Sequence, residues 1–419
     1  MHYFQYKKNK LYAEEVPVEK IVQEVGTPVY IYSHSTLERH FKAFQDAFKK
    51  TNALICFSMK CNSNIAILRS IAQMGGGVDI VSGGELFRAL RAGVNPRKIV
   101  YSGVGKTDEE IAQALKANIL MFNVESEEEL EHIQSVAARL KKKAPISLRV
   151  NPNIDPKTHP YISTGMKKSK FGIDVKNALE IYAKAQKLSH IHIVGLDCHI
   201  GSQLTQIRPF VDALKKLKEL LKKIEALGIS IQYLDLGGGL GIRYNQENPP
   251  SPADYAKAIL SELKDLNLTL IFEPGRVLMG NAGILVTETL YSKKNPAKEF
   301  VIVDAAMNDL IRPAFYGSYH DIQPIEKKKR ASRKTDVVGP ICESGDFFAK
   351  DRSLPETKSG ECLALFSAGA YGFAMSSNYN TRPRAAEVLV KGKQFDTIRK
   401  RESLEDLIRG ESIPSFLKK

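Results

Sequence analysis

The sequence predicts an α/β fold: a (β/α)8 TIM-like barrel, then a C-terminal antiparallel β domain that the N-terminal segment completes. From residue 53 to about 276, a short apolar strand, a turn and an amphipathic helix alternate eight times. After residue 280, short apolar stretches separated by Gly, Pro and charged turns replace this alternation. Strand–helix alternation indicates a parallel sheet, and eight near-regular units favour a closed barrel over an open, doubly wound sheet.

Eight apolar runs are the candidate barrel strands. Each run is flanked by turns that contain polar residues or glycine, as expected of strands that helices cover. They span residues 53–59, 78–82, 99–103, 121–125, 146–151, 192–199, 231–237 and 268–273. Helical spacing of apolar residues predicts the helices between them, over 63–74, 83–92, 108–117, 126–140, 175–187, 207–227 and 252–265.

The second domain draws its predicted strands from both ends of the chain. The C-terminal candidates span 283–291, 299–304, 335–338, 361–366 and 386–390. Near the N-terminus, Thr27–Tyr32 (TPVYIY) is also typical of a strand. We therefore expect the barrel to span 34–278 and a discontinuous β-sandwich or β-barrel domain to comprise 1–33 and 279–419.

The composition is that of a globular enzyme. The chain has 419 residues, of which 43% are hydrophobic and 26% charged. Since it shows neither a bilayer-spanning apolar run nor an apolar signal segment, we expect no membrane association and no export. The five cysteines are scattered, without a CxxC pair or zinc-ligand spacing. We expect a cytoplasmic protein with reduced thiols and no metal site.

The net charge of +14 is high enough to suggest nucleic-acid binding. The lysines and arginines, however, fall in short runs at 141–143, 222–223 and 327–330, and no alternation of aromatic and basic residues marks a stacking platform. A solvated basic surface that attracts anionic substrates is the better interpretation, so we expect no nucleic-acid partner.

The carboxyl ends of the barrel strands are where chemistry is expected. Lys60 follows the apolar run 53–59. Desolvation there would favour the neutral amine, which can attack a carbonyl; the alternative is a lysine that ends a strand and points into water. Other polar residues at these ends are Asp79, His199, Ser202, Asp235 and Glu273.

A glycine-rich turn follows the seventh strand, in 235–241 (DLGGGLG). The N–H groups of Gly238 and Gly239 can approach an anion closely, although a plain tight turn is the alternative. The stretch lacks the G-x-G-x-x-G spacing of a dinucleotide site. Barrel phosphate sites recur in the loops after strands 7 and 8. Gly275 and Arg276 lie in the second of these loops, and Ser202 can add a hydroxyl.

Glu273 and His199 are open to two interpretations each. A carboxylate at the end of a buried strand needs a partner, either Arg276 or a protonated heterocyclic nitrogen. His199 is either a satisfied core histidine or a ring stacked on a flat ligand. With Lys60 for an aldehyde and the glycine turn for a phosphate, the set matches the groups that pyridoxal 5'-phosphate needs.

Nine stretches, in order over nearly the whole chain, resemble the alanine-racemase-type barrel family of pyridoxal-phosphate enzymes, and within it the diaminopimelate decarboxylases. They are Phe57–Asn62, Val78–Glu85, Ser169–Gly172, His199–Gln203, Asp235–Gly241, Glu273–Arg276, Val303–Pro313, Gly339–Asp346 and Gly369–Gly372. Two positions depart from the family pattern: Ala306, where glycine is more common, and Phe57, where tyrosine is. The resemblance implies a homodimer with active sites shared across the interface.

The resemblance also implies a role for each motif residue. Lys60 would form the Schiff base with the cofactor, Asp79 would lie beside it, His199 would stack on its ring, and Glu273 would pair with its pyridinium nitrogen. Cys342 would enter the partner subunit's site as the proton donor. The implied phosphate-binding residues are Ser202, Gly238, Gly239, Gly275, Arg276 and Tyr371. The implied substrate-binding residues are Arg276, Arg312, Tyr316, Glu343 and Tyr371.

The implied reaction is decarboxylation of the amino acid meso-2,6-diaminopimelate to L-lysine and CO2, the last step of lysine biosynthesis. A carboxylate at the ring nitrogen favours this electron-sink chemistry over racemisation. One rival is a decarboxylase of the same fold for another basic amino acid or a carboxynorspermidine-type substrate, which would not need Arg312. Another is a catalytically silent pyridoxal-phosphate-binding protein; such proteins tend to lose the lysine or the proton donor, and this chain keeps Lys60 and Cys342.

Overall fold

The structure is a computed structural model that describes residues 2–155, 158–162, 164–165 and 169–418. The chain divides into two compact units. One, the barrel unit, comprises residues 37–280; the other, the β unit, combines residues 1–36 with 281–419. Within the described residues, no helix has both the length and the apolar character of a membrane span.

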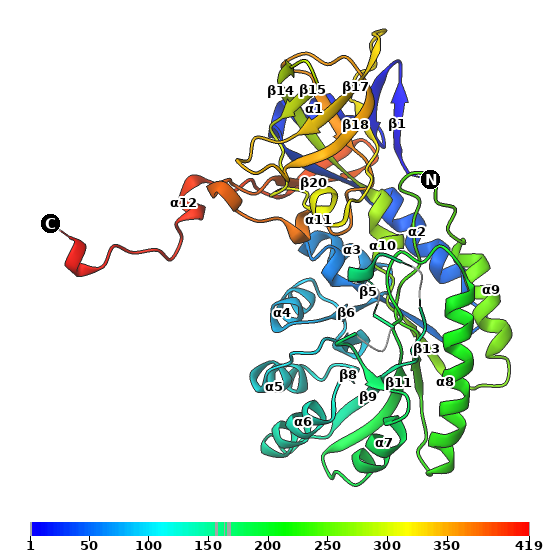
Figure 1. Cartoon of the computed structure of the whole chain (residues 1–419). Coiled ribbons are helices and arrows are strands. Elements are labelled where there is room, and N and C mark those ends of the chain that lie inside the picture. Colours follow the sequence, from blue (N-terminus) through cyan, green and yellow to red (C-terminus); the bar gives the residue numbers. More distant parts are fainter. Residues whose placement is uncertain (1, 156–157, 163, 166–168, 419) are drawn as a thin grey trace. The chain divides into compact units, whose positions relative to one another are not determined.

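Eight parallel strands form a closed ring in the barrel unit (Figure 1). They are β5 (Ala53–Ser58), β6 (Gly77–Ile80), β7 (Ile99–Tyr101), β8 (Met121–Val124), β9 (Ala144–Asn151), β11 (Ile191–Asp197), β12 (Tyr233–Asp235) and β13 (Thr269–Phe272). Pairing of β8 with β9 and of β13 with β5 closes the ring, while the short β10 (Ile173–Asp174) pairs with β9 outside it. The predicted barrel is therefore confirmed. Each strand begins and ends within two residues of the positions predicted for it.

Helices connect the barrel strands and surround them (Figure 1). They are α3 (Ile65–Gln73), α4 (Gly83–Arg91), α5 (Asp108–Ala117), α6 (Glu127–Arg139), α7 (Ala178–Gln186), α8 (Arg208–Ala226) and α9 (Pro252–Glu262). Side-chain caps explain where several begin: Ser82, Thr107, Ser126 and Ser251 each accept a backbone N–H of the first turn. The preceding helix α2 (His34–Ala47) was not predicted.

The barrel interior is filled from several strands at once. Cys56, Val100, Met121, Val194 and Ile271 come from five different strands and pack together as one buried cluster. Because strands that are not neighbours can meet only inside the ring, this cluster forms a packed core at the barrel centre, as in other barrels of this type.

The main sheet of the β unit centres on β14 (Gly283–Lys294). Its path runs β18 (Phe347–Pro355), β17 (Ser332–Val338), β15 (Glu299–Val303), β14, β4 (Val29–Ser33), β20 (Ala386–Lys391) and β21 (Gln394–Arg399). Strand β19 (Cys362–Leu365) branches from β14, and β16 (Ile322–Pro324) pairs with β19. Most pairs are antiparallel; β4–β20 and β15–β17 are parallel. The N-terminal strand β4 thus completes the β domain, as predicted.

The N-terminal segment also builds a small sheet in the β unit, from β1 (Phe4–Lys7), β2 (Lys10–Ala13) and β3 (Val16–Pro17), followed by α1 (Val18–Val25). Their apolar residues share one core with β4, β14 and β20. Short helices complete the two units: α10 (Arg276–Met279) in the barrel unit, and α11 (Arg312–Tyr316) and α12 (Leu404–Leu407) in the β unit.

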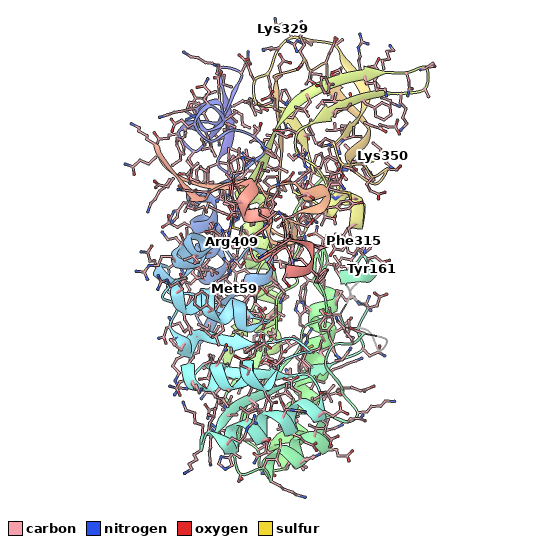
Figure 2. All side chains as sticks on the ribbon, turned by 90° about the vertical axis from the view of Figure 1, so that its left-hand side faces the viewer. Met59, Tyr161, Phe315, Lys329, Lys350 and Arg409 are labelled. Carbon is pink, nitrogen blue, oxygen red and sulfur yellow. The ribbon has the colours of Figure 1, made fainter. Side chains whose placement is uncertain are left out.

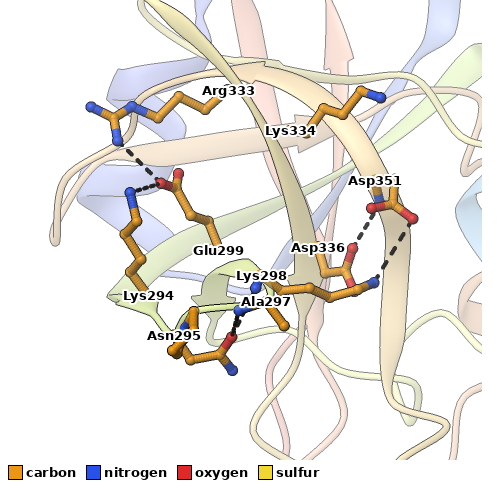
Figure 3. Close-up of a pocket in the computed structure, with 10 residues that line it drawn as sticks. Lys294, Asn295, Ala297, Lys298, Glu299, Arg333, Lys334, Asp336 and Asp351 are labelled. Atoms are coloured by element: carbon orange, nitrogen blue, oxygen red, sulfur yellow. Dashed lines mark hydrogen bonds and ion pairs between the residues drawn. The ribbon is translucent and has the colours of Figure 1, made fainter.

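Many cations of the β unit are paired. In a surface pocket along β14, β15, β17 and β18, Lys294 and Arg333 lie 2.8 and 3.1 Å from Glu299 (Figure 3). Lys298 lies 2.7 Å from Asp336 in the same pocket. These ion pairs neutralise much of the local positive charge, so the high lysine content does not produce an uninterrupted basic face at this pocket.

Candidate active site

The predicted lysine lies where its strand enters the mouth of the barrel. Lys60 sits in a short 3-10 turn directly after β5, and its side chain is about one-third exposed. Its Nζ lies 2.7 Å from Asp79 Oδ2, which also accepts the Ser58 hydroxyl at 2.7 Å. Asp79 is fully buried on β6, and its Oδ1 has no hydrogen-bond partner among the described residues. The structure therefore brings Lys60 and Asp79 together as an ion pair.

Three further carboxyl groups converge beside this pair. Asp197, Asp235 and Glu273 end or follow β11, β12 and β13, are buried, and have oxygens within 4.8 Å of one another. Burial, followed by the charge of Asp197, raises the pKa of Asp235 to about 8. Burial and the neighbouring carboxylates likewise raise the pKa of Glu273 and Asp197 well above their usual range. Such crowding favours the protonated acids unless a cation joins them.

Neutral donors and one arginine hold the acids in place. Asn123 Nδ2 lies 3.3 Å from Asp235 Oδ2 and 3.4 Å from Glu273 Oε1. Arg149, at the end of β9, lies 2.7 Å from Glu125 and 4.0 Å from Asp197. The cluster is thus fixed by contacts from several barrel strands, which keeps its carboxyl groups at one place in the barrel mouth.

His199 is held as a neutral ring. Its Nδ1 accepts the backbone N–H of Gly238 at 3.1 Å, so the ring proton belongs on Nε2. Burial, then the positive charges of Arg149 and Lys60, lowers the pKa of His199 well below its usual range. A neutral, oriented imidazole suits stacking against a flat ligand.

The glycine turn packs against the loop that follows β13. The Glu273 N–H donates to the Gly237 carbonyl at 2.8 Å. Gly239 has φ of +102°, and a Cβ there would lie 2.6 Å from the Gly201 carbonyl oxygen. A Cβ on Gly238 would meet the Glu273 carbonyl oxygen, and one on Gly275 would lie 3.0 Å from Ser58 Cβ. At positions 238 and 239, therefore, only glycine fits without a shift of the neighbouring backbone.

Arg276 and Ser202 lie together beside this turn. Arg276 Nη2 and Nε donate to Ser202 Oγ at 2.9 and 3.3 Å, and Nη1 donates to the Tyr244 hydroxyl at 2.8 Å. Arg276 is buried, so its charge acts in a low-dielectric surrounding. Glu273 is bound by Asn123 and Ser102 instead.

The remaining predicted residues belong to the β unit. Arg312 is buried at the start of α11; it lies 2.9 Å from His320 Nε2 and 3.2 Å from Ser318 Oγ. His320 Nδ1 lies 2.8 Å from the Phe366 carbonyl, so Nδ1 carries the proton and Nε2 accepts from Arg312. Tyr316 ends α11, with its ring 4.7 Å from that of Phe315.

Cys342 and Glu343 are exposed on the loop between β17 and β18. The Cys342 N–H donates to Asn380 Oδ1 at 3.0 Å. Tyr371 is partly buried and has φ of +56°. An exposed Cys342 differs from the small buried hydrophobe that a free cysteine usually is, and the structure shows the other four cysteines buried.

Sequence reasoning did not assign roles to several residues of this site. Asp197, Asp235 and Arg149 join the polar cluster in the barrel mouth, and Tyr244 joins Arg276. Asp197, Asp235 and Arg149 could have been found from the sequence, because each lies at the carboxyl end of a predicted strand. Tyr244 lies in a loop, and nothing in its local sequence indicates its contact with Arg276.

Comparisons with known proteins agree with this geometry. The family model "Pyridoxal-dependent decarboxylase, pyridoxal binding domain" matches residues 34–280. The diaminopimelate decarboxylase of Pseudomonas aeruginosa is 52% identical and covers 99% of both chains. The Helicobacter pylori diaminopimelate decarboxylase complexed with L-lysine has a TM-score of 0.91 at 47% identity, covering 94% of this chain and 98% of that one. The M. jannaschii enzyme with L-lysine has a TM-score of 0.95 at 38% identity, covering 99% of both.

The chain belongs to the diaminopimelate decarboxylase family. It is therefore a carboxy-lyase that uses pyridoxal phosphate. Three predictions made from the sequence are thus confirmed: the barrel with an attached β domain, the family and the cofactor. The roles of individual residues stay predictions.

The residues of the barrel mouth fit this decarboxylase cofactor. A protonated pyridine nitrogen is the kind of cation that the crowded acids Asp197, Asp235 and Glu273 favour. The glycine turn leaves a space that a Cβ at Gly239 would fill. Arg276 and Ser202 offer a guanidinium and a hydroxyl, which are strong donors to a phosphate.

Proposed function

We propose that this chain decarboxylates meso-2,6-diaminopimelate to L-lysine and CO2, the last step of lysine biosynthesis. The observation that carries the proposal is the buried Glu273, set among acids at the barrel mouth beside the lysine–aspartate pair. The L-lysine complexes of two similar decarboxylases support the product. The reduced, mostly buried cysteines and the biosynthetic role support a cytoplasmic location.

Lys60 holds the cofactor aldehyde through its Nζ. Asp79 positions that Nζ in the resting state through the 2.7 Å ion pair. With the cofactor held at Lys60, Asp79 would remain beside Nζ as a buried carboxylate that can stabilise positive charge there. Ser58 keeps Asp79 in this orientation.

Glu273 holds a proton at the ring nitrogen. Bound pyridoxal phosphate supplies an electron sink for the electrons left when the substrate loses CO2. A carboxylate beside the nitrogen favours the protonated ring, and the ring's charge in turn lowers the cost of ionising Glu273 among its acidic neighbours. An arginine at this position would weaken that sink, so Glu273 directs the chain toward decarboxylation.

The other barrel residues orient the cofactor. His199, neutral and fixed by Gly238, stacks on the ring face. Gly238 contributes to cofactor binding through its N–H, which holds His199. The N–H groups of Gly239 and Gly275 bind the phosphate together with Ser202 and Arg276; their chemistry and closeness support this role. We propose that the barrel over 34–278 is the cofactor-binding domain.

We propose further that the β domain, formed by residues 1–33 and 279–419, completes the active site of a second copy in a homodimer. Cys342, exposed on its loop, returns a proton to the α-carbon after CO2 leaves. Arg312 binds the distal carboxylate of the substrate, and the His320–Phe366 chain keeps its guanidinium in one orientation. Glu343 pairs with the distal amine. Tyr371 reaches the phosphate, and Tyr316 lines the substrate pocket beside Arg312.

Carbon dioxide release and L-lysine formation from meso-diaminopimelate test the proposal. Purified protein with pyridoxal phosphate is compared with Lys60→Ala and with L-ornithine and L-arginine as substrates. Lysine formation that Lys60→Ala abolishes is the expected result. Turnover of another amino acid instead would refute the assignment of Arg312 and Glu343. A yellow, cofactor-loaded protein without any turnover would point to a silent binding protein.

A further inference from the structure

The end of the chain presents apolar side chains to solvent. Residues 403–418, the C-terminal arm, include α12 and contain no buried residue. Five large apolar side chains of the arm are between 59% and 82% exposed: Leu404, Ile408, Ile413, Phe416 and Leu417. Figure 2 labels Arg409 within the arm. Apolar exposure repeated along one segment is typical of a surface that binds a partner.

The arm is shaped locally and anchored only at its root. Glu402 accepts from Asn378 Nδ2 at 2.7 Å and from the Arg384 N–H at 2.8 Å. Beyond it, Ser403 and Asp406 form a capping box, and the Leu417 N–H donates to Pro414. Among the residues that the structure describes, the hydrogen bonds of the arm stay within the arm. Its apolar side chains are therefore available to another surface.

The root of the arm shares its support with the proton-donor loop. The strip 378–384 holds Glu402 through Asn378 and Arg384, and holds the Cys342 N–H through Asn380 at 3.0 Å. Since the proposed function places Cys342 in the site of a second copy, the root of the arm faces that copy as well. This step rests on the proposed function.

The barrel unit has an exposed apolar area that suits such an arm. We call Val81, Phe87, Leu90 and Val104 the rim patch; they are 36% to 68% exposed. Val81 and Val104 follow β6 and β7, and a Cβ on Gly103 would lie 3.4 Å from Val81 Cβ, so the two loops adjoin. Phe87 and Leu90 lie one turn apart on α4. The patch begins two residues after Asp79, at the carboxyl ends of the strands.

The charges of the two surfaces are complementary. The part of the arm from 405 to 411 carries three carboxylates, Glu405, Asp406 and Glu411, against the guanidinium of Arg409, and Lys418 follows the apolar Phe416 and Leu417. Helix α4 presents Arg88 and Arg91 next to Phe87 and Leu90. The acidic segment 405–411 of the arm suits this basic apolar rim.

We propose that the C-terminal arm docks on the rim patch of a second copy of this chain. Each active site is then bordered by two pieces of the other copy, the Cys342 loop and the arm beside it. The arm strengthens the dimer at the place where the shared site forms, so that loss of the arm weakens assembly without changing any group that contacts the cofactor.

Sedimentation velocity of the cofactor-loaded protein tests this. We expect the double variant Phe416→Asp/Leu417→Asp, and separately Phe87→Asp, to raise the dimer dissociation constant at least tenfold. Their kcat per site should fall on dilution and recover at high protein concentration. Tyr291→Asp, a 68% exposed aromatic outside the arm, is the matched control and should leave the constant unchanged. An unchanged constant in the arm variants would overturn the proposal.

Photo-crosslinking identifies where the arm binds. A p-benzoylphenylalanine in place of Phe416 should crosslink to residues 81–104, and a mixture of 15N-labelled and unlabelled chains should yield crosslinks between chains. Crosslinks within one chain only, or to another region, would refute docking on a second copy. A wild-type protein that is active as a monomer would instead refute the shared active site, which separates failure of the proposed function from failure of the arm.

Discussion

Asp235 offers the most direct test of the electrostatics of the site. Burial and the neighbouring Asp197 raise its pKa from 3.8 to about 8 in the folded apoprotein. Between these two pH values the folded state keeps a proton that the unfolded state has released, so stability decreases as the pH rises through this window. About four pH units at about 1.4 kcal/mol each set a ceiling of about 6 kcal/mol on this loss.

Asp235→Asn should recover part of that loss. The amide oxygen can still accept the Gly237 N–H, which lies 2.9 Å from Asp235 Oδ1, but the amide nitrogen cannot accept from Asn123. We therefore expect a gain of about half the ceiling at pH 8, ~3 kcal/mol, and a smaller gain at pH 5. Such a gain corresponds to roughly 6–12 °C in the unfolding midpoint of a unit of this size.

Differential scanning calorimetry of the apoprotein at pH 5 and pH 8 measures this shift. Asp265→Asn, at an exposed position before β13, is the matched control and should not respond to pH differently from the wild type. If the midpoint of Asp235→Asn decreases between pH 5 and pH 8 as steeply as that of the wild type, the assigned proton on Asp235 is wrong.

Three further variants test the cofactor and proton-transfer roles. Glu273→Gln should lower kcat by about 10²–10⁴-fold in steady-state assays while the protein stays yellow, because the ring nitrogen loses its anionic partner. Cys342→Ala should lower kcat by about 10²-fold or more, and a rate within about threefold of the wild type would exclude the thiol as proton donor. Gly239→Ala should weaken pyridoxal-phosphate binding at least tenfold in titrations, since its Cβ meets Gly201. Gly228→Ala, at φ of +75° with open space around it, should change only stability, by about 1 kcal/mol.

The barrel could be predicted because its strands are covered by helices and read as continuous apolar runs. Helix α2 was missed although Leu37, Phe41 and Phe44 are buried at helical spacing. Strand β18 was missed for a different reason. Its central residues 350–352 are charged and mostly exposed, so neither alternation nor an apolar run marks the strand.

The site was only partly visible in the sequence. The rule that polar residues at strand ends meet in the barrel mouth identified Lys60, Asp79 and Glu273. It could not show that Asp197 lies close enough to Asp235 to raise its pKa, because that depends on ring closure and burial. Nor could it show that Arg312 is bonded to His320, a contact that the turn after α11 creates.

The position of β4 has a consequence for synthesis of the chain. This strand, Val29–Ser33, pairs with β14 and β20, and 249 residues lie between its end at Ser33 and the start of β14 at Gly283. At ribosomal rates of about 5–20 residues per second, the edge that pairs with β14 waits roughly 12–50 s for its partner, and the edge that pairs with β20 waits longer. During that time VYIYS is an apolar, β-prone segment with open hydrogen-bonding edges, the kind of sequence that pairs with other nascent chains. The barrel can form in this interval, but the β unit cannot, so the nascent protein should depend on chaperones that bind near its N-terminus.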